Sequence, residues 1–554
     1  MKNQVKRHTT IEVLLLVGLF LSGAAALIYE VAWVRALSLV MGSTTHALST
    51  MLASFMAGLT LGGYLGGLWA DRVKSPAFTF GLLELGIAIF GIITLIITKN
   101  LSPLYAWVFY TFHLSFSSFS LAQFALSFMT MLIPTALMGA TFPLVLKARA
   151  KNLNELGRET GDVYSINNLG AVLGSFAAGF ILIPTLGVTT TNMVAASLNM
   201  VVALMVLSIS KSSFKIWGIG VGVVLFSLSS FLSLYSNHPS YIFNYYKALR
   251  FTSYDSFQEF NKWKRLLFEK EGVQGLVQVF TDTRDGHLLL MNNGRIEGSV
   301  TRIGDQIGGS TSIDWINQLL SAYLPLEANP GARSFLNIGL GTGTTLRAAI
   351  SDTDLREIDC VEINPAVVEA VESYFYPGLT KDPRVRFIVA DARNYLSLVH
   401  KRYDIISSEP SYPGDQGMSN LFSLEFFRLV RARLTEGGVF AQWLPGYLLS
   451  DEDKRMMIRT FGIAFPYTYV WQIDVSEDVI LLGSDGPLTS PDKILERVES
   501  MKNAKGLGQD YRLWLMPKDV RGIVEKGGII NTDDMPILEF VSARNMLDSG
   551  HGFR

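Results

Sequence analysis

The sequence predicts a protein in two parts, an N-terminal bundle of membrane-spanning helices and a C-terminal α/β domain with a doubly wound sheet. Three observations lead to this fold class. The first 235 residues consist mainly of long apolar segments, and the residues beyond about 330 alternate between short apolar strands and helix-compatible stretches. A glycine-rich turn joins the first of these strands to the first of these helices.

The composition agrees with two unlike halves. The chain has 554 residues, of which 49% are hydrophobic, and this is more apolar than a soluble domain of ordinary composition. Residues 1–235 have a net charge of +6 and residues 236–554 a net charge of −7. The second half has no basic stripe, so no nucleic-acid partner is expected. The single cysteine, Cys360, excludes an intramolecular disulfide and a cysteine-based zinc site, and no metal site is predicted.

Seven segments are long and apolar enough to cross a bilayer, which requires about 20 apolar residues. They are residues 11–40, 45–70, 78–98, 119–146, 163–184, 190–210 and 216–235. The shorter apolar segment 101–116 contains Pro103 and His113 and predicts an interfacial or re-entrant helix. A lipid bilayer is therefore an expected partner of this half.

Glu30, Arg35 and Glu84 are ionisable residues in the interior of the predicted spans. Because burial of a charge in a bilayer is costly, such residues are candidate functional groups by default. The alternative is a buried Glu30–Arg35 ion pair that holds the bundle together. The sequence favours neither interpretation over the other.

The predicted boundaries follow from these changes in composition. Residues 1–235 form the transmembrane domain, and the aromatic and lysine-rich residues 236–272 form an interfacial linker helix. Residues 273–330 form a β-hairpin region, in which Asp285-Gly286 and Asn293-Gly294 are strong turn signals. The α/β core then occupies 331–545 and a tail 546–554.

The α/β core shows seven predicted strands separated mostly by helices. The strands lie near 334–338, 357–361, 385–389, 403–407, 438–443, 467–473 and 477–482, and the helices near 344–351, 365–375, 392–399, 424–434 and 451–463. Ligands of such sheets bind at the carboxyl ends of the strands.

The segment 334–362 predicts a nucleoside site. Its glycine turn allows positive φ angles and a close approach of the backbone to a ligand. Glu362 ends the next strand, 23 positions after Gly339, where its carboxylate can accept hydrogen bonds from two ribose hydroxyls. The GxGxG spacing is closer to class I methyltransferase-like folds than to the dinucleotide motif GxGxxG. The candidate nucleoside-binding residues are Gly339, Gly341, Thr342, Gly343 and Glu362.

Polar side chains follow three further predicted elements. Asp391-Ala392 follows the third strand, where the acid can accept a hydrogen bond from an adenine amino group, cap a helix, or do both. Glu409 and Tyr412 lie in a loop with two prolines after the fourth strand, and they are the candidate catalytic residues; a rigid turn with a solvated glutamate is the alternative. Asp534 precedes a predicted terminal strand, 537–541, and either lines the cleft or belongs to a turn.

These features together resemble the spermidine synthase family of polyamine aminopropyltransferases over roughly residues 275–545. The whole chain resembles the bacterial membrane-fused branch of that family. The resembling stretches are SGAAALIYEVAWVRALSLVMGS (22–43), LIPTALMGATFPL (132–144), INNLGAVLGSFAAGFILIPTLG (166–187), GLGTG (339–343), SSEPSYP (407–413) and NTDDMPILEF (531–540).

The resemblance implies β-hairpins followed by a Rossmann-like, class I methyltransferase core. It also implies decarboxylated S-adenosylmethionine, or S-adenosylmethionine, as the donor and an amine such as putrescine as the acceptor. Glu409 takes the place of a loop aspartate that helps to deprotonate the attacking amine. Soluble members form oligomers, which is consistent with a homodimer.

Several positions depart from the pattern of the soluble enzymes. Thr342 stands in place of an aspartate that holds the amino group of the donor, and Tyr412 replaces a second acid of the loop. Glu297 stands at the position of a hairpin glutamine, and Asp314 can match the aspartate that precedes a His-Glu pair in the soluble enzymes; both are candidate substrate residues. Asn317-Gln318 occupy the place of a His-Glu pair. Nucleoside binding therefore transfers from the family more directly than the identity of the acceptor.

Two other functions remain compatible with the sequence. One is a different S-adenosylmethionine-dependent transferase that acts on a membrane-delivered substrate, and the other is a transporter or sensor whose α/β domain binds a nucleoside or polyamine without turnover. The resemblance places the protein in the bacterial inner membrane. By the positive-inside rule the N-terminus is cytoplasmic, and seven spans would put the α/β domain outside. Because adenosyl-sulfonium donors are made in the cytoplasm, the side of this domain stays open.

Overall fold

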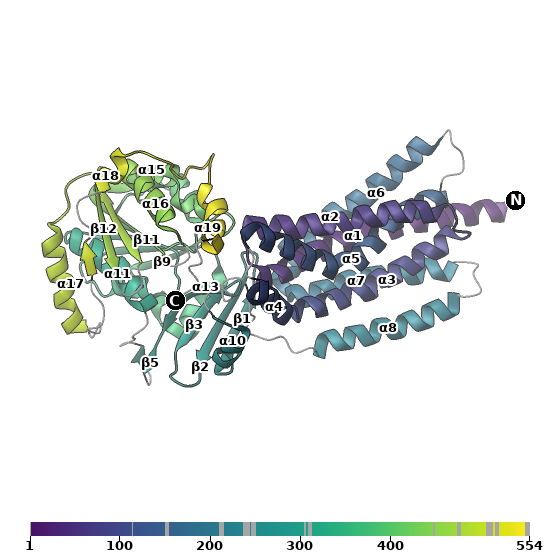
Figure 1. The fold of residues 1–554 in the computed structure, drawn as a ribbon, viewed down its shortest axis with the longest axis horizontal. Helices are drawn as coiled ribbons and strands as arrows, with labels where there is room; N and C mark the ends of the chain where they lie inside the picture. Colours follow the sequence, from purple (N-terminus) through teal and green to yellow (C-terminus); the bar gives the residue numbers. More distant parts are fainter. Residues whose placement is uncertain are drawn as a thin grey trace. The chain divides into compact units, whose positions relative to one another are not determined.

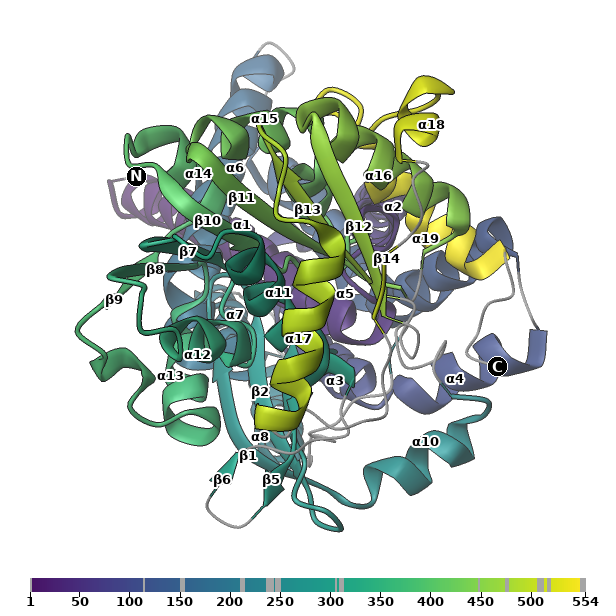
Figure 2. The same cartoon turned by 90° about the vertical axis from the view of Figure 1, so that its left-hand side faces the viewer.

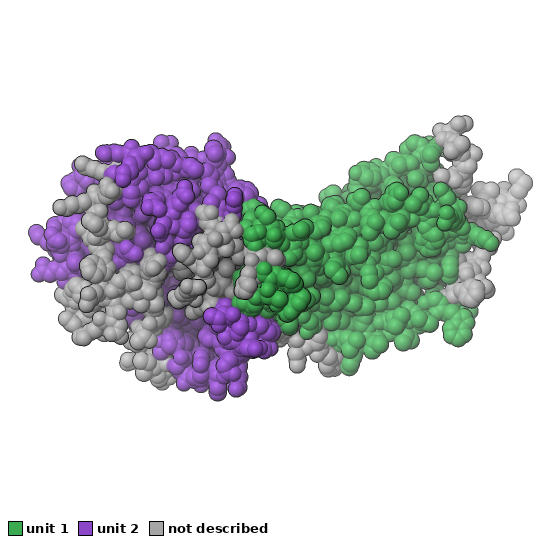
Figure 3. Space-filling model, in the orientation of Figure 1, with its two compact units in different colours: residues 1–42, 46–248, 271–273 green, residues 43–45, 249–270, 274–554 purple. Residues whose placement is uncertain are grey.

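The computed structural model describes most of the chain (Figure 1). The described residues are 2–112, 115–149, 155–209, 215–235, 244, 251–303, 306–307, 313–446, 449–473, 478–505, 513–515 and 520–548. The chain divides into two compact units (Figure 3). The first unit comprises residues 1–42, 46–248 and 271–273, and the second comprises 43–45, 249–270 and 274–554.

The first unit is helical. Its helices are α1 (Lys2–Met41), α2 (Thr45–Ala70), α3 (Pro76–Lys99), α4 (Ser102–Phe112), α5 (Phe116–Arg149), α6 (Leu156–Ala177), the π-helical turn η2 (Ala178–Leu182), α7 (Ile183–Ile209) and α8 (Lys215–Tyr235). Helix α1 packs along α6 and α7, and α3 packs along α5 and α7. Gly170 and Gly174 of α6 allow this close approach, because a Cβ atom at either position would lie within 2.2 Å of a backbone carbonyl oxygen of α1.

Five helical segments among the described residues are long and apolar enough to cross a membrane. They are Glu12–Met41, Thr45–Ala70, Pro76–Lys99, Phe116–Arg149 and Leu156–Ile209. The predicted number of seven differs for two reasons. The predicted spans 163–184 and 190–210 fall within the one segment 156–209, which is broken at Gly187 (φ 75°). The predicted span 216–235 falls in α8, whose described apolar part, Ile216–Leu232, is shorter than the others.

The ionisable residues of this unit do not form the predicted Glu30–Arg35 pair. The guanidinium of Arg35 instead donates to a Glu271 carboxylate oxygen at 2.8 Å and to the carbonyl oxygen of Gly272 at 2.7 Å. Glu30 is buried, and its Oε2 has no hydrogen-bond partner in the described part of the chain. Residue spacing alone suggested the pair, but a partner far along the sequence satisfies Arg35 better.

The second unit begins with a four-stranded sheet in the order β1-β2-β3-β4. Its strands are β1 (Lys264–Glu271), β2 (Leu276–Asp282), β3 (Leu288–Asn292) and β4 (Arg295–Val300), preceded by helix α10 (Tyr254–Asn261). The hairpin turns at Asp285-Gly286 and Asn293-Gly294 are confirmed by the antiparallel pairing of β2 with β3 and β3 with β4. A short two-stranded sheet, β5 (Arg302–Ile303) and β6 (Gln306–Ile307), and helix α11 (Ile313–Ala328) follow.

The predicted linker helix over 236–272 is wrong in its last part. Residues 236–243 and 245–250 lie outside the described residues, and 264–271 form strand β1 rather than helix. The strand is stabilised by pairing with β2 and by packing of Leu267 and Phe268 against the core. The prediction used only the composition of this segment, whereas its structure depends on a neighbouring strand.

The α/β core contains a mixed eight-stranded sheet in the order β14-β12-β13-β11-β10-β7-β8-β9 (Figure 2). Its strands are β7 (Ser334–Ile338), β8 (Glu357–Glu362), β9 (Val385–Val389), β10 (Tyr403–Ser408), β11 (Leu434–Leu444), β12 (Tyr467–Ile473), β13 (Val479–Ser484) and β14 (Leu513–Leu515). The five strands from β11 to β9 are parallel, and β12 and β13 add antiparallel pairs. The predicted doubly wound sheet is confirmed.

Helices cover both faces of this sheet (Figure 2). On one side lie α11, α12 (Thr344–Ile350), α13 (Pro365–Ala370) with the π-helical turn η3 (Val371–Phe375), the 3-10 turn η4 (Leu379–Lys381) and α17 (Pro491–Lys505). On the other lie α14 (Ala392–Leu398), the 3-10 turn η5 (Met418–Phe422), α15 (Leu424–Ala432), α16 (Asp451–Ala464), α18 (Val520–Glu525) and α19 (Ile537–Asp548). The main core lies between the sheet and α11, α12 and α13.

The predicted terminal strand at 537–541 is wrong, because α19 begins at Ile537. Pro536 immediately precedes the helix, and proline is favoured at helix starts. The buried residues Leu538, Glu539 and Ser542 also follow helical spacing rather than the alternation of a strand. A short apolar run in the sequence does not distinguish a strand from a buried helix.

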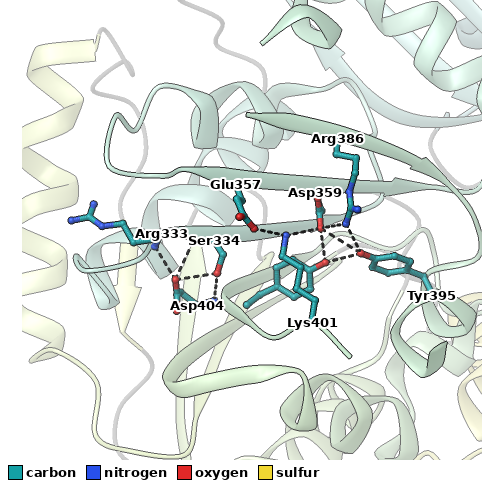
Figure 4. Close-up of polar contacts among 9 residues, drawn as sticks. Arg333, Ser334, Glu357, Asp359, Arg386, Tyr395, Lys401 and Asp404 are labelled. Atoms are coloured by element: carbon teal, nitrogen blue, oxygen red, sulfur yellow. Dashed lines mark hydrogen bonds and ion pairs between the residues drawn. The ribbon is translucent and has the colours of Figure 1, made fainter. Parts of the chain in front are cut away.

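Two aspartates tie the central strands together (Figure 4). Asp404 on β10 accepts hydrogen bonds from the backbone N–H groups of Arg333 and Ser334 at 2.8 and 3.0 Å, which fixes β10 against the start of β7. Asp359 on β8 is buried and accepts from Arg386 of β9 at 2.7 Å and from Tyr403 of β10 at 2.6 Å. These contacts set the register of the strands whose ends form the site described below.

Asp359 also has an electrostatic signature. Burial by itself would raise its pKa, but the hydrogen bonds from Arg386, Tyr403 and Lys401 outweigh that effect and lower the pKa below its ordinary value. Its ionised form is therefore favoured in the folded state. The resulting stability is present above the ordinary aspartate pKa and is lost as the pH falls through the lowered one.

We predict that Asp359→Asn lowers the stability of the second unit by about 2–3 kcal/mol, because it leaves buried donors poorly paired. Thermal unfolding of the detergent-solubilised chain followed by circular dichroism at pH 7 measures this. The matched control is Asp354→Asn, since Asp354 forms an exposed ion pair with Arg333 and should change stability by less than about 0.5 kcal/mol. Equal effects of the two substitutions would contradict the assignment.

Candidate functional site

A pocket in the second unit lies at the carboxyl ends of β7, β8, β9 and β10. Because these strands are parallel neighbours, the segments that follow them meet at one edge of the sheet. Nine of the residues predicted from the sequence line this pocket. They are Glu297, Asp314, Gly339, Gly341, Glu362, Asp391, Ala392, Glu409 and Tyr412.

The glycine turn forms the floor of the pocket next to β7. Gly339, Gly341 and Gly343 all have positive φ angles, of 81°, 52° and 87°, which residues with a side chain rarely adopt. The Glu362 carboxylate accepts hydrogen bonds from the backbone N–H groups of Leu340 at 2.9 Å and Asn364 at 2.8 Å. The turn and the predicted ribose-binding acid are therefore held together by direct contact.

The environment of Glu362 balances two opposing effects. Its side chain is buried, which raises its pKa, while the two backbone N–H groups stabilise the ionised form and partly offset that rise. Each carboxylate oxygen keeps further acceptor capacity after these bonds. A ligand with two neighbouring hydroxyls suits such an acid, because each hydroxyl can donate to one oxygen.

Asp391 caps a helix and also lines the pocket. It is the N-cap of α14, since its Oδ1 accepts a hydrogen bond from the Asn394 backbone N–H at 2.8 Å. It also lines the pocket together with Ala390 and Ala392. Capping one helix terminus thus fixes the position of the acid at the pocket edge.

Glu409 lies directly after β10, on the opposite side of β7 from Glu362. The Thr345 hydroxyl donates to Glu409 Oε1 at 2.6 Å. Burial raises the pKa of Glu409 to about 7, although the hydroxyls of Thr345 and Ser321 act to lower it. A carboxyl group with this pKa exchanges a proton readily near neutral pH, which is the property required of a general base.

Tyr412 belongs to a polar network on the other wall of the pocket. The Arg295 guanidinium forms ion pairs with Glu297 at 2.9 Å and with Asp415 at 2.8 Å and lies 5.9 Å from the centre of the Tyr412 ring. Ser411 donates to the second oxygen of Glu297 at 2.7 Å. This network fixes the loop that follows Glu409.

Residues 43–45, which belong to the second unit, extend this network. Ser43 donates to Asp415 Oδ1 at 3.2 Å, and the carbonyl oxygen of Ser43 accepts from the Gln416 backbone N–H at 3.2 Å. The Thr45 hydroxyl donates to Glu539, which also accepts from the Gly417 backbone N–H at 3.1 Å. The loop from Ser411 to Gly417 is therefore held by a segment that is distant in sequence.

Three predicted site residues do not line the pocket. Thr342 is fully buried and bonds to Gln318 and to Thr344. Gly343 packs below the turn, because a Cβ atom there would lie 2.7 Å from Val371. Asp534 is exposed, and its neighbour Asp533 forms an ion pair with Arg393 instead. Because these three residues do not face the pocket, the structure does not support a direct role for them in ligand binding.

The structure adds residues that sequence reasoning did not select as site residues. Arg295, Asn317, Gln318 and Trp443 all line the pocket. Gln318 reaches it from α11 and bonds to Thr342, so the amide, and not the threonine, faces the ligand space. The departure from the family pattern at Asn317-Gln318 was the available signal, but an amide pair has no distinctive spacing.

The charge of the pocket is strongly one-sided. Its lining contains five carboxylates and one guanidinium, and that guanidinium is paired with two acids. Such a lining attracts cations and repels anions. No cluster of three or more His, Cys, Asp or Glu side chains placed to hold a metal ion occurs within the residues that the structure describes.

The fold of the second unit is of the class I methyltransferase-like α/β type, with an acidic pocket at the carboxyl ends of its strands. Residues 317–474 match the family model of the spermine/spermidine synthase domain. This match confirms the predicted resemblance for that part of the chain.

Curated relatives agree with this assignment. The chain is 29% identical to polyamine aminopropyltransferase 1 of Pseudomonas aeruginosa over 188 residues, which are 33% of this chain and 64% of that protein. It is 26% identical to the polyamine aminopropyltransferase of Corynebacterium efficiens over 479 residues, 82% of each chain. A match of that length extends into the first unit. The crystal structure of spermidine synthase from Thermotoga maritima is 18% identical and covers 48% of this chain and 88% of that chain, with a TM-score of 0.38.

We predict that Glu362→Gln weakens binding of methylthioadenosine by about 10-fold or more, because hydrogen bonds to a charged acceptor contribute roughly 1.5–3 kcal/mol. Calorimetric titration of the detergent-purified chain measures the dissociation constant. The control is Asp534→Asn, which changes an exposed acid outside the pocket and should leave affinity unchanged. An unaltered affinity of the Glu362 variant would exclude this acid from ribose binding.

Proposed function

We propose that the chain transfers an aminopropyl group from decarboxylated S-adenosylmethionine to an amine such as putrescine. The observation on which the proposal rests is Glu409, a partly buried carboxyl group with a pKa of about 7, placed beside the glycine turn in an acidic pocket. Both proposed substrates are cations, and five carboxylates line the pocket. The names of the relatives support the same reaction.

The proposed chemistry requires one nucleophilic displacement. The acceptor nitrogen attacks the methylene carbon next to the sulfonium, so a carbon–nitrogen bond forms and a carbon–sulfur bond breaks. The electron pair of the broken bond remains on sulfur, which leaves as neutral methylthioadenosine. The nitrogen loses one proton, and ionised Glu409 accepts it.

The residues around the pocket divide this work. Glu362 and Asp391, on the β8 and β9 side, suit the ribose and adenine of the donor, because they are acceptors next to the glycine turn. Glu297 and Asp314 face the pocket from β4 and α11 and suit the distal ammonium of a diamine. Tyr412 and Trp443 supply apolar surface for the methylene chain and exclude water.

The first unit suggests where this reaction takes place. Its five long apolar helices have the length that a bilayer requires, and a bacterial inner membrane is the proposed location. Cytoplasmic placement of the second unit is the simplest arrangement, because it gives direct access to a cytoplasmic donor. A homodimer remains part of the proposal on the strength of family resemblance alone.

We predict that Glu409→Gln lowers kcat by about 100-fold or more, since general base catalysis typically contributes 10²–10⁴-fold. Release of methylthioadenosine from decarboxylated S-adenosylmethionine and putrescine measures turnover. Binding of methylthioadenosine should stay within about 3-fold of the wild type, because Glu362 is intact. Full turnover in the variant would remove Glu409 from the mechanism.

A comparison of donors separates the proposal from its nearest competitor. If the wild-type protein binds S-adenosylmethionine in preference to the decarboxylated donor and releases no methylthioadenosine, another S-adenosylmethionine-dependent transfer takes its place. Nucleoside binding without turnover of either donor would favour a transporter or sensor.

We predict an acidic limb in the pH profile of kcat/KM with a midpoint near 7, because Glu409 must be ionised to accept a proton. Activity should fall about 10-fold per pH unit below that midpoint and level off above it. Thr345→Val removes a hydrogen bond that lowers the pKa of Glu409, so its limb should move to higher pH. An unshifted limb, or one moved to lower pH, would show that another group titrates.

A further inference from the structure

The interior of the first unit contains a polar pair that the proposed function does not use. Glu84 of α3 and Asn199 of α7 are both almost fully buried, at 0% and 1% exposure. The Asn199 Nδ2 amide donates to Glu84 Oε2 at 2.6 Å. Ser22 of α1 also hydrogen-bonds to Glu84. Three helices that pack on one another therefore meet at this carboxyl group.

Each member of the pair has one oxygen atom without a partner. Glu84 Oε1 and Asn199 Oδ1 are both buried, and neither forms a hydrogen bond with any described residue. An amide oxygen is only an acceptor, and so is an ionised carboxylate. With Glu84 ionised, the side chains would leave two acceptors unsatisfied in an apolar interior, which is costly.

A single proton on Glu84 removes both deficits. The protonated Oε1 can donate to Asn199 Oδ1 while Asn199 Nδ2 donates to Oε2, so the acid and the amide form two opposed hydrogen bonds. The same proton removes the negative charge, whose burial without a cation would cost several kcal/mol. One bound proton thus completes the hydrogen bonding of both side chains.

The surroundings of Glu84 contain no compensating cation within the described residues. Arg35 of α1 pairs with Glu271, and Arg149 of α5 pairs with Glu159. Lys147 of α5 donates to the Ala70 carbonyl oxygen. Lys99 lies at the far end of α3 itself, and the sequence of α7 contains no charged residue. On α1, the ionisable residue that interacts electrostatically with Glu84 is Tyr29, which is neutral near pH 7.

We propose that Glu84 and Asn199 form a proton-binding site inside the helical bundle, with the proton on Glu84 Oε1 shared with Asn199 Oδ1 at neutral pH. Loss of the proton turns this contact into a repulsion between a carboxylate and an amide oxygen. Because Glu84 is on α3 and Asn199 on α7, proton release weakens the contact between these helices. Proton occupancy and the packing of α3 on α7 are therefore linked.

Infrared difference spectroscopy of the full chain in lipid vesicles at pH 7 tests the site. Subtraction of the Glu84→Gln spectrum from the wild-type spectrum should leave the carbonyl stretch of a protonated carboxylic acid and no carboxylate bands. The matched control is Glu159→Gln, because Glu159 is paired with Arg149 at 2.7 Å and should contribute only carboxylate bands. Glutamine at position 84 can reproduce both hydrogen bonds with Asn199, so thermal stability should be retained.

A second variant keeps the test independent of that substitution. Asn199→Leu removes the acceptor of the shared proton, so the acid carbonyl band should move to higher frequency with Glu84 unchanged. Carboxylate bands in the wild-type minus Glu84→Gln spectrum would overturn the proposal and would point to an ionised Glu84 bound to water or a cation. If Glu84→Gln does not fold, the wild-type and Asn199→Leu spectra still test the proposal. The proposal is overturned if the wild type shows no acid carbonyl band, or if Asn199→Leu leaves the frequency of that band unchanged.

Discussion

The parallel pairing of β7 with β8 on one side and β10 on the other is the constraint on which the candidate site depends. This pairing brings three segments that are distant in sequence, the glycine turn, Glu362 and Glu409, to one edge of the sheet. The contacts of Asp359 and Asp404 hold these strands in register. A shift by one residue would turn each of these side chains to the opposite face.

Burial of acids is the second organising feature of the pocket. Glu362 is stabilised by two backbone N–H groups, whereas Glu409 receives hydroxyl donors only. A backbone N–H keeps its position as a donor, whereas a hydroxyl can rotate and can also accept a hydrogen bond. The proposed roles of these two glutamates differ accordingly: Glu362 is the acceptor for hydroxyl groups, and Glu409 is the group that gains and loses a proton.

The sequence predicted those parts of the site that depend on local order along the chain. The strand, the glycine turn and Glu362 follow one another within 334–362, and the structure brings Gly339, Gly341 and Glu362 to the pocket. Contacts between distant segments were not accessible in this way. Gln318 displaces Thr342 from the pocket because α11 packs over the glycine turn. Arg35 likewise pairs with Glu271, which is distant in the sequence. The short apolar run at 537–541 suggested a strand, but Pro536 and the helical spacing of the buried residues favour helix α19.

Buried carboxyl groups in this chain are accommodated in three ways. Asp359 has cations within hydrogen-bonding distance and stays ionised. Glu409 has hydroxyl donors, no ion-pair partner among the described residues, and a pKa near 7. Glu84 has an amide and a serine and, as proposed, keeps its proton. Burial disfavours the anion at all three positions, and the donors available at each position then decide the protonation state. A group that accepts a proton near neutral pH needs both protonation states close in free energy, and Glu409 meets this condition inside the pocket, as the proposed base must.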